Sequence, residues 1–234
     1  MLLENYYREE NNVVQFTREQ ASKFAKEIAD DFNPLHDVDA KRFCVPGDLL
    51  FSLLLSKAGL HEKMTFNFTG MVTEETRLTF PNNIANEASI RDESKDYVKV
   101  AVEGDSTANN TTIESLTKAY VEFSGHTFPH ILVALMAKES VMINPARPMI
   151  MYESMSIELN NLNFDDVELV LADSILSIDG KRGTADLIFD LKSNGEVIGH
   201  GKKHMLLSGL RPYEQAVIDD VVNQYNDTKK AYFS

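Results

Sequence analysis

The stretch from Val45 to Leu55 can be stable only in the interior of a protein. It reads VPGDLLFSLLL, and its apolar residues cover every side of a helix instead of one stripe. A helix of that kind must be buried. Because Gly59 follows shortly after this stretch, the sequence predicts a buried helix over residues 47–59, around which the rest of the chain packs.

A polar loop precedes this helix. The segment 17–30 opens with a capping-box pattern and continues with helical spacing, so it predicts an amphipathic helix. Pro34 biases Asn33 away from helical backbone, and the helix therefore ends here. The loop carries Asp31 and His36, a carboxylate and an imidazole, which are side chains that general acid–base catalysis commonly uses.

The start of the buried helix adds a third part of a site. The first N–H groups of a helix have no partner within it, and the helix dipole places a partial positive charge there. Gly47 would let a ligand oxygen approach these donors closely. We therefore expect a base, an acid and an oxyanion-binding site close together.

This loop and helix resemble the MaoC-like (R)-specific enoyl-CoA hydratases of the hotdog fold. The signature of that family is Gly-Asp-x-Asn-Pro-x-His-x-Asp, followed by a buried helix that opens with His-Gly. The residues that match are Asp31, Asn33, Pro34, His36 and Gly47, and Ser52 falls where several members carry a serine. The sequence departs from the signature at Asp30, in place of glycine, and at Pro46, in place of histidine; Asp48 follows the helix glycine.

The resemblance implies a protein that acts on acyl thioesters, most specifically a (R)-specific trans-2-enoyl-CoA hydratase. It implies that Asp31 and His36 are catalytic, and that the substrate is an acyl-CoA or acyl-carrier-protein thioester. The residues expected to bind that substrate are Asn33, Gly47, Asp48 and Ser52. No cofactor is implied, and no spacing of His, Asp and Glu residues indicates a metal site.

Two alternatives to an enzyme stay open. The first is a non-catalytic acyl-thioester or acyl-carrier-protein binding module, in which Asp30, Pro46 and Asp48 spoil the chemistry. Asp48 at the mouth of the helix would compete with a thioester oxygen for the N–H donors, and Asp30 and Asp37 would crowd His36 with further negative charge. The second is a purely structural double hotdog that acts through protein contacts.

Segments with strand character follow the buried helix. They cover residues 64–68, 75–80, 85–91, 97–103 and 111–123. The pattern then repeats, because Phe128-Pro129 aligns with Val45-Pro46, and a second buried helix is expected over 129–142. There His130 takes the place of Gly47, so this half is expected to lack an oxyanion site.

Further strands are expected over 156–162, 167–178, 184–192 and 197–207, with hairpin turns at Asp179-Gly180 and Asn194-Gly195. The fold class predicted from this order is α+β, a double hotdog with two antiparallel sheets, each wrapped around a buried helix, which join into one. The predicted units are an N-terminal hotdog over 1–125 that carries the motif, a C-terminal hotdog over 126–210, and a C-terminal helix over 211–234. That helix is expected to cover a sheet edge or a dimer contact.

Charge and cysteine content limit the partners. The sequence has 23 Lys and Arg against 36 Asp and Glu, a net charge of −13, without a basic cluster. Nucleic-acid binding needs the opposite sign. A single cysteine excludes internal disulfides and fits a reducing compartment. Without a signal peptide or a run of about 18 apolar residues, we expect a cytoplasmic protein with no membrane partner, and a homodimer stays open.

Overall fold

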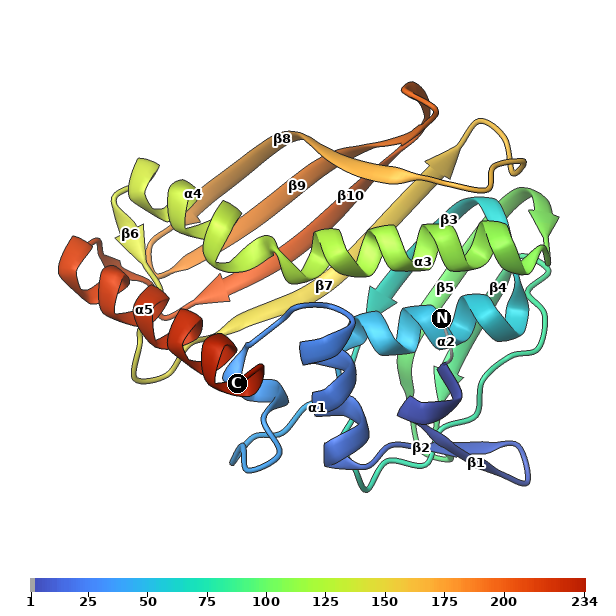
Figure 1. The fold of residues 1–234 in the computed structure, drawn as a ribbon, viewed down its shortest axis with the longest axis horizontal. Helices are drawn as coiled ribbons and strands as arrows, with labels where there is room; N and C mark the ends of the chain where they lie inside the picture. Colours follow the sequence, from blue (N-terminus) through green and yellow to red (C-terminus); the bar gives the residue numbers. More distant parts are fainter. Residues whose placement is uncertain (1–2) are drawn as a thin grey trace.

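The chain forms a seven-stranded antiparallel sheet with its main helices on one face (Figure 1). The computed structural model describes residues 3–234. The strands run in the order β4-β5-β3-β7-β10-β9-β8 across the sheet. Their bounds are β3 (Leu60–Phe68), β4 (Glu87–Arg91), β5 (Asp96–Thr107), β7 (Ile150–Leu159), β8 (Glu168–Asp179), β9 (Arg182–Ser193) and β10 (Glu196–Ser208).

The helices are α1 (Arg18–Glu27), α2 (Gly47–Ala58), α3 (Asn110–Gly125), α4 (Leu132–Lys138) and α5 (Gln215–Tyr232). Short helical turns lie at η1 (Leu3–Tyr6), η2 (Pro34–His36) and the π-helical turn η3 (Thr127–Ile131). Two small antiparallel strand pairs complete the fold, β1 (Arg8–Glu10) with β2 (Val13–Gln15) and β6 (Val141–Met142) with β11 (Arg211–Pro212).

The two halves of the chain share this sheet. Strand β3 of the first half pairs with β7 of the second, with Met64 opposite Ile157 and Phe66 opposite Met155. The predicted joining of two strand sets into one sheet is confirmed, as is the α+β class. The division into units at residues 125 and 210 stays a prediction.

Helix α2 is the buried helix that the sequence predicts. Its apolar side chains from Leu49 to Leu55 are at most 2% exposed. The ring of Phe51 packs against Phe66 on the sheet, with 5.1 Å between the ring centres, and against Tyr120 on α3, with 4.7 Å between the ring centres. Burial of each such side chain contributes about 1.5–3 kcal/mol, so α2 anchors both the sheet and its neighbouring helix.

The predicted strand over 111–123 is wrong, because this segment lies in α3. Its β-branched residues suggested a strand. However, Ile113, Leu116 and Tyr120 recur at helical spacing and are all buried. Asn109 caps the helix, since its side chain accepts hydrogen bonds from the N–H groups of Thr111 and Thr112.

The second buried helix was therefore placed too late in the sequence. The helix beside α2 on the sheet is α3, whereas the expected helix over 129–142 is reduced to the short, amphipathic α4 (Figure 1). Only Leu132, Leu135 and Met136 of α4 are buried. His130 is exposed in η3 and does not begin a central helix, so the alignment of Pro129 with Pro46 does not mark an equivalent position.

The remaining strand predictions are confirmed except one. The segments expected over 64–68, 85–91, 97–103, 156–162, 167–178, 184–192 and 197–207 overlap β3, β4, β5, β7, β8, β9 and β10, and the two hairpin turns lie where expected. The segment 75–80 is not a strand of the sheet. It is tied to β2 by an isolated bridge in which Val14 and Leu78 exchange backbone hydrogen bonds of 2.7 and 2.9 Å.

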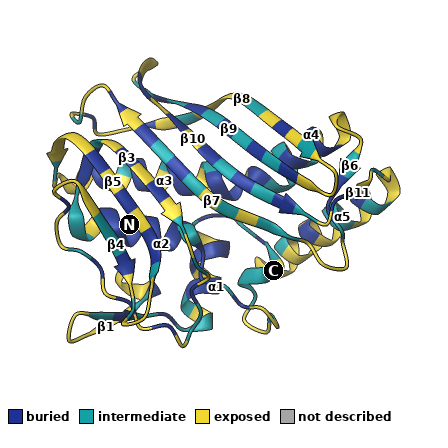
Figure 2. Ribbon diagram, turned by 180° about the vertical axis from the view of Figure 1, so that it is seen from behind, coloured by how far each residue is buried: buried dark blue, intermediate teal, exposed yellow. Residues whose placement is uncertain are grey.

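The face of the sheet away from the helices carries many exposed residues (Figure 2). Lys63 and Glu158 form an ion pair of 2.8 Å across two strands there, and His200 lies 2.9 Å from Asp190. One solvated face and one core face are the usual arrangement for an antiparallel sheet. Within residues 3–234, none of the helices has the length and apolar character needed to span a bilayer.

Candidate active site

The loop that carries Asp31 is shaped by its own side chains. The N–H of Asp31 donates to the carbonyl of Ala25 at the end of α1, over 2.8 Å. Asp31 Oδ1 accepts a hydrogen bond of 2.9 Å from the N–H of Asn33, and Asn33 Oδ1 accepts one of 3.1 Å from Leu35. These Asx-type turns fix the loop between α1 and η2. Asn33, expected to bind substrate, uses its side-chain oxygen as the cap of η2.

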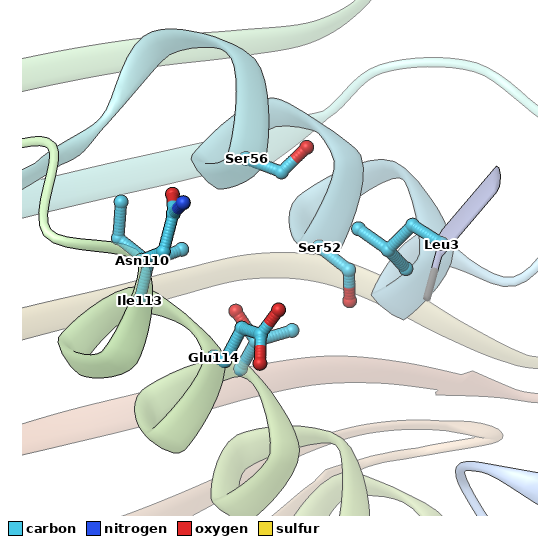
Figure 3. A pocket seen from close by; sticks show the side chains of 7 residues that line it. Leu3, Ser52, Ser56, Asn110, Ile113 and Glu114 are labelled. Atoms are coloured by element: carbon cyan, nitrogen blue, oxygen red, sulfur yellow. The ribbon is translucent and has the colours of Figure 1, made fainter. Parts of the chain in front are cut away.

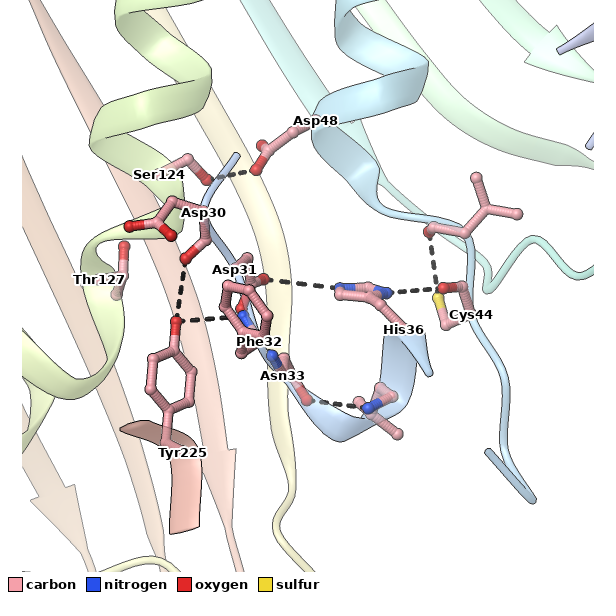
Figure 4. Close-up of polar contacts among 12 residues, drawn as sticks. Asp30, Asp31, Phe32, Asn33, His36, Cys44, Asp48, Ser124, Thr127 and Tyr225 are labelled. Carbon is pink, nitrogen blue, oxygen red and sulfur yellow. Dashed lines mark hydrogen bonds and ion pairs between the residues drawn. The ribbon is translucent and has the colours of Figure 1, made fainter. Parts of the chain in front are cut away.

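His36 faces Asp31 from the end of that turn (Figure 4). Its Nδ1 donates to the carbonyl oxygen of Cys44 over 2.7 Å. Because a carbonyl can only accept, Nδ1 carries a proton and Nε2 is the atom directed at Asp31. Nε2 lies 3.7 Å from Asp31 Oδ2, and the two side chains are 12% and 25% exposed. That separation is too long for a direct hydrogen bond, but one water can contact both atoms.

The N-terminus of α2 lies beyond this pair. Pro46 is the N-cap and supplies no side-chain hydrogen bond, and within residues 3–234 the N–H groups of Gly47 and Asp48 have no acceptor. A side chain at Gly47 would meet the rings of Phe68 at 3.1 Å and Tyr152 at 3.2 Å. Because Gly47 has no side chain, these two rings can pack directly against the first turn of α2.

The side chain of Asp48, expected at the mouth of the helix, is directed at α3. It is buried, and its Oδ2 accepts a hydrogen bond of 2.6 Å from the hydroxyl of Ser124 near the end of α3 (Figure 4). Lys203 of β10 donates to the same hydroxyl over 2.6 Å. Burial raises the pKa of the Asp48 carboxyl, while the nearby charge of Lys203 lowers it. The Oδ2 oxygen of Asp48 is therefore engaged by Ser124 and does not compete with a ligand for the helix donors.

Asp30 and Asp37, the carboxylates expected to crowd His36, both have cationic partners. Asp30 is held by Lys229 of α5 and lies 3.2 Å from His126 Nε2 at the end of α3. Asp37 forms an ion pair of 2.7 Å with Lys26 of α1. Both carboxylates are neutralised by neighbouring cations instead of by His36.

Asp30 occupies a position that favours glycine. Its φ is 54°, in the left-handed region, which aspartate tolerates better than most residues. This is the position at which the resembled family carries glycine. The aspartate retains the backbone shape and adds an anchor to Lys229.

Ser52 lies one helical turn after Asp48 and is fully buried. Its hydroxyl donates to the carbonyl oxygen of Asp48 over 2.6 Å, so its proton is already used. It also lines a small cavity of about 50 Å³ between α2 and α3 (Figure 3). Its expected contact with substrate stays a prediction, as do those of Asn33, Gly47 and Asp48.

A larger groove lies on the other side of α3. Its volume is about 610 Å³, and its walls are α3, η3 and the start of β8, with Phe123, Ile131 and Leu169 among the apolar residues. Neither Asp31 nor His36 lines this groove or the small cavity.

Sequence reasoning missed the polar residues of α3, β7 and β10 that lie near the start of α2. Lys203 is 5% exposed, although the sequence shows it next to the exposed Lys202. The alternation of β10 contained the signal, because Gly201, Lys203 and Met205 fall on one face of the strand. Tyr120, which is buried, and Tyr152, which is half-buried, add two phenols whose hydroxyl groups contact each other.

In the described part of the chain, no cluster of three or more His, Cys, Asp or Glu side chains is arranged to hold a metal ion. The groups that lie near the start of α2 are the Asp31 and His36 pair, the N–H groups of Gly47 and Asp48, and the buried charges of Asp48 and Lys203.

Two central helices on one face of a continuous antiparallel sheet define a protein of the hotdog class. A solved structure described as a conserved protein of unknown function with hot dog fold, from Alicyclobacillus acidocaldarius, superposes with a TM-score of 0.50 at 8% identity, over 91% of this chain and 99% of that chain. This likeness confirms the predicted hotdog fold. The chain belongs to the family described as protein of unknown function (DUF3581), whose model matches residues 1–216.

Other solved structures are more distant. A putative thioesterase II from Thermobifida fusca YX gives a TM-score of 0.47 at 8% identity, covering 89% of this chain and 98% of that chain. The acyl-CoA thioesterase II TesB2 from Mycobacterium marinum gives a TM-score of 0.41 at 9% identity, covering 92% of this chain and 99% of that chain. No curated protein is found to match the chain.

Proposed function

We propose that this protein acts on acyl thioesters and that it hydrates trans-2-enoyl thioesters to (3R)-3-hydroxyacyl thioesters. The observation that carries the proposal is the position of His36 Nε2, 3.7 Å from Asp31 Oδ2, with Nδ1 tied to the Cys44 carbonyl. A carboxylate and an imidazole at this spacing can hold one water between them. The motif resemblance at these two residues supports the same reaction.

In the proposed reaction the carbonyl oxygen of the thioester accepts hydrogen bonds from the N–H groups of Gly47 and Asp48. These donors and the dipole of α2 stabilise negative charge that develops on that oxygen. The substrate's β-carbon thereby becomes electron-poor. The rings of Phe68 and Tyr152 lie against Gly47 in the first turn of α2. On binding of the thioester, these rings would either move aside by a small amount or pack on both sides of it.

The water oxygen forms a bond to the β-carbon while Asp31 takes one of its protons. The electron pair of the carbon–carbon double bond then moves to the α-carbon, which takes a proton from Nε2 of His36 in its doubly protonated form. Return of the proton from Asp31 to His36 completes the cycle. Because both groups lie on one loop, they act on the same face of the substrate, and one hand of product results.

The absorbance of the enoyl thioester tests this proposal. Asp31→Asn and His36→Ala should each slow the loss of crotonyl-CoA by roughly 10²- to 10⁴-fold, the usual cost of losing general acid–base catalysis. His130→Ala is the matched control, because His130 is an exposed histidine outside the pair, and it should retain nearly full activity. Equal losses from all three changes would refute the assignment.

A non-catalytic module that binds acyl-CoA or acyl-carrier-protein thioesters is the second candidate. The close packing of Phe68 and Tyr152 over Gly47 favours it, because these rings restrict the approach of a carbonyl oxygen to the helix donors. A thermal shift with crotonyl-CoA that occurs without loss of its double bond would select this candidate. No shift and no turnover would instead favour a purely structural role.

A further inference from the structure

Lys203 is a charged residue at a core position. On β10 its neighbours on the same face are Gly201 and Met205, both buried, and Lys203 itself is 5% exposed. Transfer of an ammonium group out of water is costly unless the group is paired and hydrogen-bonded. A buried, paired ion of this kind beside titratable groups is typical of functional sites.

The partners of Lys203 come from both halves of the chain. Its Nζ donates to the hydroxyl of Ser124 over 2.6 Å, and that hydroxyl donates to Asp48 Oδ2, also over 2.6 Å. The ammonium group also lies 3.4 Å from Thr127 Oγ1 and 4.7 Å from the centre of the Tyr152 ring. Lys203 therefore holds the carboxylate of Asp48 through a single bridging hydroxyl.

The other oxygen of that carboxylate has no partner. Asp48 Oδ1 is buried and, within residues 3–234, accepts no hydrogen bond. An ionised carboxylate only accepts, so this atom needs a donor from water or from a ligand. Asp48 is the second residue of α2, next to the free N–H groups, and its pKa responds to the charges of Asp31 and His36.

We propose that Lys203 is a positioning residue which, through Ser124, holds Asp48 so that its free Oδ1 accepts a hydrogen bond from the reacting water. This inference rests on the proposed function and adds a third contact to the water held by Asp31 and His36. Lys203 lies in the predicted C-terminal unit, which lacks the sequence motif, and Ser124 lies at the end of α3. The proposed centre is therefore composite, with Asp31 and His36 from the loop before α2 and Lys203 from β10.

The experiment compares Ser124→Ala and Lys203→Met with Lys202→Met. Lys202 is the adjacent lysine on the exposed face of the same strand, where it pairs with Asp186 at 3.5 Å, so it controls for loss of a lysine. The first readout is carbon NMR of the side-chain carboxyl of Asp48, assigned with Asp48→Asn and followed against pH. The second readout is kcat and KM with crotonyl-CoA.

Ser124 and Lys203 both lower the pKa of Asp48, so their removal should raise the pH at which this carboxyl titrates, whereas Lys202→Met should not. We expect kcat to fall at least about tenfold in Ser124→Ala and Lys203→Met with little change in KM, because the lost contact is to the water and not to the thioester. Ser124→Ala decides alone if Lys203→Met does not fold, since it removes only a hydroxyl.

An unchanged titration of Asp48 in Ser124→Ala would overturn the inference, as would an effect on KM alone. The titration does not depend on turnover, so failure of the proposed function is recognised separately. If the natural protein shows no hydration, the proposed function falls. A shifted titration would then still establish that Lys203 holds Asp48.

Discussion

The hydroxyl of Tyr225 donates a hydrogen bond of 3.1 Å to the carbonyl oxygen of Asp30, although the two residues are 195 positions apart in the chain. The same hydroxyl accepts a hydrogen bond of 3.1 Å from the N–H of Phe32. One phenol thus holds the backbone on both sides of Asp31. Helix α5, expected to cover a sheet edge or a dimer contact, fixes the loop that carries the candidate base.

Tyr225→Phe should therefore loosen this loop. The change leaves the Phe32 N–H and the Asp30 carbonyl without their partner, at a cost of about 1–3 kcal/mol in the free energy of unfolding. Tyr213→Phe is the control, because the hydroxyl of Tyr213 makes only an exposed hydrogen bond of 3.2 Å to Gln215. Urea unfolding of both variants measures the difference in their free energies of unfolding. Equal stability of the two variants would contradict the role of the Tyr225 hydroxyl in holding the loop.

The end of α3 makes an unusually close approach to the end of α1. A Cβ at Gly125 would lie 1.6 Å from the carbonyl oxygen of Ala29, so no side chain fits unless the helices separate. We expect Gly125→Ala to lower the free energy of unfolding by about 4 kcal/mol or more. Gly180→Ala, in an open turn with φ of 57°, should cost only about 1–2 kcal/mol. Thermal unfolding distinguishes the two, and a mild effect at Gly125 would contradict the close packing.

Cys44 offers a prediction on pH. Burial raises the pKa of its thiol from 9.0 to about 11, so the thiol is protonated at pH 8. Because the thiolate is the reactive form, labelling of the folded protein with a disulfide reagent at pH 8 should be much slower than labelling in urea. As the only cysteine of the sequence, Cys44 accounts for the whole signal.

The same raised pKa predicts a loss of stability in base. The folded chain holds this proton more tightly than the unfolded chain, so the contribution is complete below about pH 9 and disappears as the pH rises toward 11. A Cys44→Ala variant should lose less stability over this interval. Fast labelling of the folded protein at pH 8 would show that the thiol is not protected.

The parts of the molecule that could be predicted from the sequence are those set by local pattern. The all-round apolar run after Gly47 could only be a buried helix, and the spacing of Asp31 and His36 around Asn-Pro indicated a shaped loop. Segment 111–123 was misread because β-branched residues at its start outweighed the helical spacing of Ile113 and Tyr120. The repeat at Pro129 matched in letters but not in space.

The long-range part of the site could not be derived in the same way. The contact of Tyr225 with Asp30 depends on where α5 docks, and nothing in either local sequence encodes that docking. The burial of Lys203 was visible in the alternation of β10, but its bridge to Asp48 requires that α2, α3 and β10 meet. Such contacts arise from packing of the whole chain, and only the structure supplies them.

The most direct test of the central claim is analysis of the product formed from crotonyl-CoA. Water addition by Asp31 and His36 from one loop predicts a single hand of 3-hydroxybutyryl-CoA, formed by the natural protein and not by Asp31→Asn, and the motif resemblance predicts that this hand is (3R). Chiral chromatography of the released acid identifies the hand, and mass spectrometry shows whether the thioester is intact. Free coenzyme A, a (3S) product, or an unchanged yield from Asp31→Asn would contradict the proposal.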